Sequence, residues 1–196
     1  MSYIKQNDLL LNKLLEYYNK NDNMNKMLGI INGESRISLR IVDWFATNFA
    51  KKYYTVYNIT NNITNNESDE NIKRFKVYVD YKLNLKAYSK RRFDPFCRWD
   101  RITIPYNGTE EDKIKNTHIQ TTIGQLNFFK WALENKVVEY IEHNYSEIEA
   151  DMNNRNSTSK RKTNNTQKTR KKREELSISA TKSIKREEVE IVVEFN

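Results

Sequence analysis

The sequence predicts an α+β fold, in which a small antiparallel sheet is packed by two or three helices, one of them long. Three observations lead to this prediction. The 196 residues include 12% aromatic residues but only four glycines and two prolines, as expected for a chain with a packed interior. Arg74 to Lys86 alternates apolar and polar residues with a period of two, which is typical of a strand. From Thr122 onward, apolar residues repeat at three- and four-residue steps, which is typical of a helix.

Two helices and a strand are expected in the N-terminal third of the chain. Apolar side chains recur at helical spacing from about Asn7 to Tyr18, with Asn7 as the expected N-cap. Residues 21–33 are expected to form a loop. A wide apolar face predicts a second helix over Ser35 to Lys52, and the run YYTVYNIT predicts a strand over Tyr53 to Thr60.

The clearest strand signal, Arg74 to Lys86, follows a polar, asparagine-rich loop over residues 61–71. Successive side chains of a strand point to opposite faces, so three lysines are expected opposite the apolar face: Lys76, Lys82 and Lys86.

A turn around Pro95 is expected to separate this strand from an antiparallel partner, the run RITIPY at residues 101–106. Residues 119–122 predict a further short strand. Thr122 then begins the strongest helical pattern, with Gln125 three residues later as in a capping box. This helix would run roughly thirty residues if unbroken, and its C-terminal part carries an acidic face formed by Glu139, Glu142, Glu147, Glu149 and Asp151.

Basic residues concentrate in two segments, although the net charge of the chain is only +8. Residues 153–173 hold nine basic and no acidic side chains, and residues 73–101 hold ten basic and three acidic ones. The remainder of the chain is therefore net acidic.

Residues 153–173 contain no aliphatic or aromatic side chain, so burial cannot offset the entropy cost of ordering them. We therefore expect a folded domain over residues 1–152, a disordered basic linker over 153–173, and a C-terminal segment over 174–196 whose final strand joins the sheet. Such a linker attracts polyanions, and KRK followed by RKKR resembles a bipartite nuclear-import signal. A solubilising spacer is the alternative.

The sequence offers few groups for metal binding or catalysis. Cys97 is the single cysteine, which excludes an intramolecular disulfide, and His118 and His143 are too few for a closed zinc site. Glycine-rich phosphate loops and the GxSxG and HExxH motifs do not occur in the sequence. The N-terminus is too polar for a signal peptide, and no eighteen apolar residues run together. A soluble, intracellular chain without membrane contact, metal or cofactor is expected.

The strongest enzymatic candidate is the run DYK at residues 80–82. With Asp69 or Glu70 it resembles the carboxylate and lysine spacing of a metal-dependent nuclease, and an exposed face of a strand is the alternative. Neighbouring cations could activate the Cys97 thiol, and a small, partly buried residue is the alternative there. We favour the structural alternative in both cases and expect a protein that is not an enzyme.

The basic segment around Pro95 combines cations with aromatic rings. Arginine and lysine neutralise nucleic-acid phosphates, and exposed rings stack on unpaired bases. Burial in the core is the alternative for the rings of Phe93, Phe96, Trp99 and Tyr106. We predict a non-sequence-specific nucleic-acid-binding protein that contacts DNA or RNA through a patch at residues 86–101 and an arm at residues 155–173. The expected contact residues are Lys86, Lys90, Arg91, Arg92, Phe93, Arg98, Trp99 and Arg101 in the patch, and Lys160, Arg161, Lys162, Arg170, Lys171, Lys172 and Arg173 in the arm.

A second hypothesis is an assembly protein that binds acidic protein partners or associates with itself. The helix faces around Trp44 and Trp131 would supply the contact, with burial in the core as the alternative.

Most of the expected folded part is covered by four stretches: SLRIVDWFATNFAKK, FKVYVDYKLNLKAYSKRRFDPFCR, TTIGQLNFFKWALENKVVEYI and ELSISATKSIKREEVEIVVEFN. These stretches resemble a family of proteins from giant nucleocytoplasmic DNA viruses, mimivirus-like ones in particular. The resemblance implies a viral source, with the protein in the virion or in the virus factory of the host cytoplasm, and the nucleus as a further location. It supplies no catalytic residue, and the assembly hypothesis becomes one of virion or virus-factory assembly.

Overall fold

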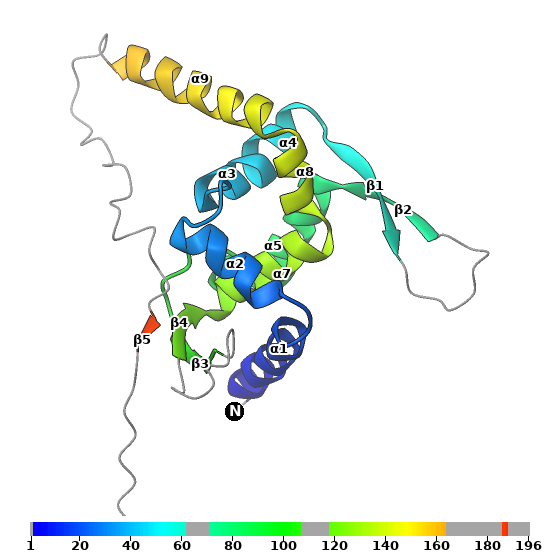
Figure 1. Cartoon of the computed structure of the whole chain (residues 1–196), viewed down its shortest axis with the longest axis vertical. Coiled ribbons are helices and arrows are strands. Elements are labelled where there is room, and N and C mark those ends of the chain that lie inside the picture. The colour runs from blue at the N-terminus through cyan, green and yellow to red at the C-terminus, as the bar shows by residue number, and fades with distance from the viewer. Residues whose placement is uncertain (1, 62–70, 107–117, 164–185, 188–196) are drawn as a thin grey trace, which may run out of the picture. The chain divides into compact units, whose positions relative to one another are not determined.

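The computed structural model describes residues 2–61, 71–106, 118–163 and 186–187, and it has the predicted α+β fold (Figure 1). Contacts between residues divide the chain into two compact units. Unit 1 comprises the described residues of Met1–Ser35, Lys90–Lys130 and Leu176–Asn196, and unit 2 comprises those of Arg36–Ser89 and Trp131–Glu175.

Unit 1 begins with two helices, α1 (Ser2–Tyr18) and α2 (Asn23–Asn32). The first predicted helix is confirmed, but it begins before Asn7, so Asn7 is not its N-cap. α2 contradicts the loop predicted for residues 21–33, because four apolar side chains at helical spacing are buried within this polar stretch: Met27, Leu28, Ile30 and Ile31. The helix ends at Gly33, whose φ of 76° is favourable for glycine.

Unit 1 contains an antiparallel sheet of three strands in the order β3 (Arg101–Pro105), β4 (His118–Thr122) and β5 (Arg186–Glu187). The strands predicted at residues 101–106 and 119–122 are confirmed. The predicted partner of the first is wrong, because β3 pairs with β4, with Ile104 opposite Ile119. Residues 188–196, where the C-terminal strand is predicted, lie outside the described residues.

α7 (Ile123–Glu134) follows β4 directly, and its start is capped by Thr122 as predicted. The Thr122 hydroxyl accepts from the backbone N–H of Gln125 at 3.2 Å. The hydroxyl of Tyr18 donates to the carbonyl of Leu126 at 2.7 Å, which ties α1 to α7. Phe93 packs against Phe128 with ring centroids 5.5 Å apart, and both rings belong to the core of unit 1.

Unit 2 begins with a helical stretch made of α3 (Leu39–Trp44), the π-helical η1 (Phe45–Phe49) and α4 (Ala50–Lys52). This stretch confirms most of the helix predicted over residues 35–52. The hydroxyl of Ser38 caps it by accepting from the backbone N–H of Ile41 at 3.3 Å. Its predicted apolar face is buried and includes Ile37, Leu39, Ile41, Val42, Phe45 and Phe49.

β1 (Val56–Asn61) and β2 (Asn71–Lys76) form an antiparallel ribbon, with Tyr57 opposite Phe75. The strand predicted over residues 53–60 is confirmed from Val56 onward, and the strand predicted from residue 74 is correct only as far as Lys76. Residues Val77–Arg92 form the helix α5, interrupted at Ser89, whose φ is 62°. Of the alternating apolar residues, Val77 and Tyr81 are buried one helical turn apart, whereas Val79 and Leu83 are exposed.

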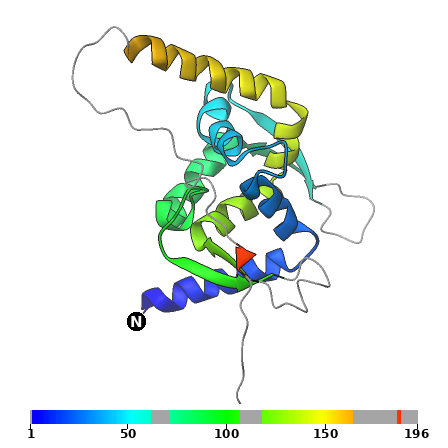
Figure 2. The ribbon, with the colours of Figure 1, turned by 60° about the vertical axis from the view of Figure 1, so that its left-hand side comes forward.

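The long helix predicted from Thr122 is broken into three: α7, α8 (Val137–His143) and α9 (Tyr145–Thr163). The first break lies at Lys136, whose φ of 53° is left-handed, and the second at Asn144. α9 packs against α3 and η1 and continues beyond them (Figures 1 and 2). Residues 153–163 of the predicted disordered linker are therefore helical, because they prolong a helix anchored by the buried Ile148 and Met152. Residues 164–173 lie outside the described part.

The core of unit 2 is rich in aromatic rings. Tyr57 stacks on Tyr140 with ring centroids 4.8 Å apart, and its hydroxyl donates to the carbonyl of Asn135 at 2.7 Å. Burial raises the pKa of Tyr57, so this hydroxyl keeps its proton. Trp131 is 5% exposed and packs against Phe75, so the core alternative holds for this tryptophan. Among the described helices, none has both the length and the apolar character needed to cross a membrane.

Candidate nucleic-acid interface

The centre of the predicted patch is the segment of residues 93–100 in unit 1, called here the 93–100 loop, which joins α5 to β3. Polar groups of the β4–α7 junction hold its backbone in place. The amide of Gln125 donates to the carbonyl of Pro95 at 3.1 Å, and the hydroxyl of Thr122 donates to that of Cys97 at 3.4 Å. The amide of Asn127 donates to the carbonyl of Arg92 at 2.9 Å, just before the loop. These three side chains are buried, so their hydrogen bonds fix the loop rather than compete with water.

Gly124 allows the loop to approach α7 closely. A Cβ atom at this position would lie 2.9 Å from the Cβ of Cys97 and 3.1 Å from the carbonyl oxygen of Arg91. The backbone N–H of Asp94 donates to the carbonyl of Gly124 at 3.3 Å. A side chain at residue 124 would therefore push the loop away from the helix.

Cys97 is a packing residue at the base of the loop. It is 3% exposed, and its Sγ lies 3.4 Å from the carbonyl oxygen of Arg91 and 3.8 Å from that of Trp99. The small, buried alternative considered for Cys97 is thus the correct one.

Four predicted cations of the patch are exposed around this loop: Lys90, Arg91, Arg98 and Arg101. Arg91 Nε lies 2.7 Å from Asp100 Oδ2, and this hydrogen bond lowers the pKa of Asp100. Arg101 donates to the side-chain oxygen of Gln120 at 3.0 Å. Arg92 is half-buried and contributes less surface than the others. An exposed ion pair contributes little stability, so the guanidinium of Arg91 can exchange Asp100 for another anion at small cost.

The aromatic residues of the patch divide into core and surface. Phe93 is 1% exposed and Tyr106 4%, so the prediction that Phe93 contacts nucleic acid is wrong. Its ring is instead packed on Phe128. Phe96 is half-buried, and Trp99 is 75% exposed. Trp99 is therefore the most exposed ring of the patch, and Phe96 exposes part of its ring.

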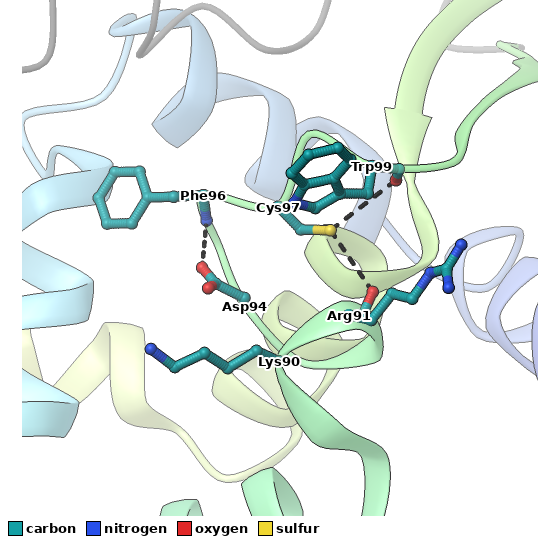
Figure 3. Close-up of a pocket in the computed structure, with 6 residues that line it drawn as sticks. All are labelled: Lys90, Arg91, Asp94, Phe96, Cys97 and Trp99. Atoms are coloured by element: carbon teal, nitrogen blue, oxygen red, sulfur yellow. Dashed lines mark hydrogen bonds between the residues drawn. The ribbon is translucent and has the colours of Figure 1, made fainter.

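A pocket of about 440 Å³ opens beside the loop. It is lined by Lys90, Arg91, Asp94, Phe96, Cys97 and Trp99 (Figure 3). Asp94 accepts from the backbone N–H of Phe96 at 2.8 Å. Burial raises the pKa of Asp94, and the hydrogen bond from Phe96 and the charge of Lys90 partly oppose that rise. The sequence pattern Asp-Pro-Phe is typical of a side chain that bonds the backbone two residues later, but it does not reveal a pocket.

Lys86 belongs to unit 2 and lines a different pocket, of about 490 Å³. Its other lining residues lie on the same face of α5 or next to it: Tyr78, Val79, Lys82, Leu83 and Leu85. The predicted patch is therefore divided between the two units, and only residues 90–101 gather around the 93–100 loop.

The predicted basic arm begins on α9 in unit 2. Asp151 anchors this helix by accepting from Trp44 Nε1 at 3.1 Å and from the ammonium of Lys52. Burial acts to raise the pKa of Asp151, but the hydrogen bonds from Lys52 and Trp44 outweigh it and lower the pKa. Arg155 lies over the Trp44 ring, 5.5 Å from its centroid, and donates to the side-chain oxygen of Asn48 at 3.1 Å.

Of the arm residues, Lys160, Arg161 and Lys162 lie on the C-terminal part of α9. The remaining four lie outside the described residues: Arg170, Lys171, Lys172 and Arg173.

The carboxylate considered for metal chemistry is used in packing. Asp80 accepts from Trp131 Nε1 at 2.6 Å and from the side-chain amide of Asn84 at 3.0 Å. Asp69 and Glu70 lie outside the described residues. In the part of the chain that the structure describes, no group of three or more His, Cys, Asp or Glu side chains is arranged to hold a metal ion.

Comparison with known proteins places this chain in a family. The model of a family of unknown function, DUF7197, matches residues 3–194. The chain belongs to this family. It is 44% identical over 143 residues to a protein of Acanthamoeba polyphaga mimivirus, the uncharacterized protein L507, and the match covers 72% of this chain. It covers 51% of that relative, so the chain spans about half the relative's length. No solved structure matches the chain. The expected resemblance to giant-virus proteins is thus confirmed in part: the chain is related to a mimivirus protein.

Proposed function

We propose that this protein binds nucleic acid without sequence specificity through the 93–100 loop and its flanking cations. The proposal rests on the exposure of Trp99. Its side chain is 75% exposed on a loop that buried polar side chains hold in place, and exposed cations flank this loop. A tryptophan in this setting can stack on an unpaired base while the neighbouring cations contact phosphates.

The fixed backbone of the loop strengthens the proposal. Hydrogen bonds from Gln125, Thr122 and Asn127 hold the loop before any ligand arrives. Ordering a loop upon binding costs free energy, and a loop that is already ordered avoids this cost. The exposed cations supply charge attraction to any phosphate backbone, and this attraction carries no sequence preference.

The basic arm is an auxiliary contact in this proposal. Lys160, Arg161 and Lys162 belong to α9, and Asp151 anchors this helix to Trp44. We assign Lys86 to the same auxiliary role, because it belongs to unit 2.

The proposal is tested by fluorescence anisotropy with the intact chain and labelled single- and double-stranded DNA and RNA. The test variant carries Arg91→Ala, Arg98→Ala and Arg101→Ala. A matched control replaces three exposed lysines of α1 and its surroundings, Lys13→Ala, Lys20→Ala and Lys26→Ala, which removes the same charge from unit 1. We expect the test variant to bind at least about tenfold more weakly than the control. Equal affinities of the two variants would reject the loop as the binding surface.

A second candidate function, assembly of a virion or virus factory through acidic protein partners, is favoured by a different surface. Val79 and Leu83 of α5 are 44% and 61% exposed, and their pocket is flanked by Lys82 and Lys86. Such a surface fits a partner segment that combines apolar and acidic side chains. Nuclease treatment before size-exclusion chromatography distinguishes the two candidate functions, because it degrades the nucleic acid of a complex and leaves a protein assembly intact.

The relationship to a mimivirus protein makes a viral location part of the proposal. We propose that the protein acts in the virus factory of the host cytoplasm or in the virion, and the basic runs at residues 160–173 leave nuclear import as the alternative. Immunofluorescence of infected cells over the infection cycle tests these locations.

A further inference from the structure

We infer that the pocket beside Trp99 receives one unpaired guanine of a single-stranded nucleic acid, with Asp94 accepting hydrogen bonds from its Watson–Crick edge. This inference rests on the proposed function and names the ligand of the same site.

The pocket has the size and lining of a ligand site. Its volume of about 440 Å³ lies within the usual range for small-molecule pockets, roughly 300–1,000 Å³. Phe96 and the indole of Trp99 supply aromatic surface, and Lys90 and Arg91 supply positive charge. Aromatic surface with neighbouring cations suits a nucleotide, whose base stacks and whose phosphate is anionic.

Asp94 determines which part of a nucleotide the pocket can accept. A carboxylate repels a phosphate, so the group beside Asp94 must instead bring N–H donors. The carboxylate forms no ion pair with any described residue, and its hydrogen bond from the Phe96 N–H, 2.8 Å long, fixes its orientation. An ionised carboxylate can accept several further hydrogen bonds.

The arrangement in the pocket brings Asp94, an aromatic ring and a cation to one side of the loop. Figure 3 shows the side chains of Phe96 and Lys90 extending to the same side as the Asp94 carboxylate, whereas the guanidinium of Arg91 extends to the opposite side. A base beside Asp94 therefore has the Phe96 ring and the Lys90 ammonium within the same pocket.

Guanine is the base whose edge matches a carboxylate. It offers two adjacent donors, N1–H and the N2 amino group, so both can donate to one carboxylate. Adenine and cytosine place an acceptor nitrogen beside their amino group, and thymine and uracil flank their N–H with carbonyl oxygens, which a carboxylate repels. In a duplex this edge is paired with cytosine, so the match requires a single strand.

The inference is tested with the intact chain and labelled twelve-residue oligothymidylates that carry one central guanine, adenine, cytosine or thymine. A single guanine avoids association between guanine-rich strands. We expect the guanine oligonucleotide to bind at least about fivefold more tightly than the other three, since a matched pair of hydrogen bonds gives roughly this discrimination. Replacing guanine with inosine, which lacks the N2 amino group, should remove most of this preference. This comparison needs no protein variant.

Asp94→Asn provides the second arm of the test. Asparagine retains an oxygen for the Phe96 N–H but places a donor in the pocket, so the guanine preference should disappear. The affinity for oligothymidylate should stay equal or rise, because the variant removes a negative charge that repels thymine carbonyls and phosphates. Equal binding of all four oligonucleotides by the wild type, or a preference for another base, would overturn the guanine assignment and leave the proposed function standing. Absence of binding to every oligonucleotide at low salt would also overturn the guanine assignment, and the proposed function fails as well if the intact chain binds none of the single- and double-stranded DNA and RNA ligands of the anisotropy test.

Discussion

The two glycines within the described helices, Gly29 and Gly124, should respond in opposite ways to the same substitution. A Cβ added at Gly29 in α2 would meet no atom within 4 Å, whereas a Cβ at Gly124 in α7 would lie 2.9 Å from the Cβ of Cys97. Alanine is favoured over glycine in a helix interior by about 0.5–1 kcal/mol, so Gly29→Ala should stabilise the protein by about that amount. Overpacking typically costs about 1–3 kcal/mol, so Gly124→Ala should destabilise it by up to about 2 kcal/mol.

Urea unfolding monitored by circular dichroism measures both changes, and thermal unfolding should show them as shifts of about 2–4 °C per kcal/mol. A double-mutant cycle attributes the cost to the loop. Cys97→Gly removes both side-chain atoms nearest to the added methyl group, so part of the cost of Gly124→Ala should be recovered in the Cys97→Gly background. If Gly124→Ala were as stabilising as Gly29→Ala, the 93–100 loop would not lie against α7 as described.

Three further predictions concern single side chains. Trp99→Ala should weaken binding of single-stranded nucleic acid by about 1–3 kcal/mol in anisotropy titrations, and should leave the unfolding midpoint unchanged because the ring is 75% exposed. Asp151→Ala should lower the free energy of unfolding by about 1–3 kcal/mol, because it leaves the Trp44 N–H without its acceptor. The pKa of Asp151 is lowered in the folded protein, so the part of this contribution that depends on its charge should be present at neutral pH and be lost as the pH falls through the folded-state pKa. The protonated carboxyl can still accept from Trp44, so the Asp151→Ala effect should shrink in acid, and an effect of equal size in acid and at pH 7 would contradict this reasoning. Burial raises the pKa of Asp94, so its ionised form destabilises the fold, and Asp94→Asn should leave stability at pH 7 unchanged or raise it. Any gain in stability should vanish below the ordinary carboxyl pKa of 3.8. A clear loss of stability at pH 7 would refute this prediction.

The elements that the sequence predicts correctly are those with local signals. Thr122 and Gln125 mark the start of α7, and the apolar face predicted over residues 35–52 belongs to the helical stretch that the structure caps at Ser38. β3 and β4 follow from short β-branched runs, although their pairing with each other does not, because pairing depends on contacts between distant residues.

α5 shows why a strong local pattern can mislead. Its apolar residues recur at every second position, but a helix needs only those four apart to face the core, and Val77 and Tyr81 satisfy this spacing. Val79 and Leu83 complete the alternation but remain exposed. The helix break at Lys136 also has no signal in the sequence, because lysine does not favour the left-handed backbone conformation that it adopts there.

The candidate site was predictable in its charges and not in its geometry. Lysine and arginine rarely lie buried, so the sequence identifies the exposed cations around the 93–100 loop. The sequence cannot show that Phe93 is buried and Trp99 exposed, because burial of Phe93 depends on Phe128, thirty-five positions away in the chain. The pocket beside Asp94 likewise requires the loop to be held by Thr122 and Gln125.

The salt dependence of binding tests the central claim most directly. The intact wild type and the variant with Arg91→Ala, Arg98→Ala and Arg101→Ala are titrated against one labelled single strand at several salt concentrations. Each phosphate contact on a single strand contributes about 0.7 to the slope of log affinity against log salt, so loss of three contacts should reduce the slope by about two. A variant with the wild-type slope and affinity would show that the 93–100 loop does not contact the nucleic acid.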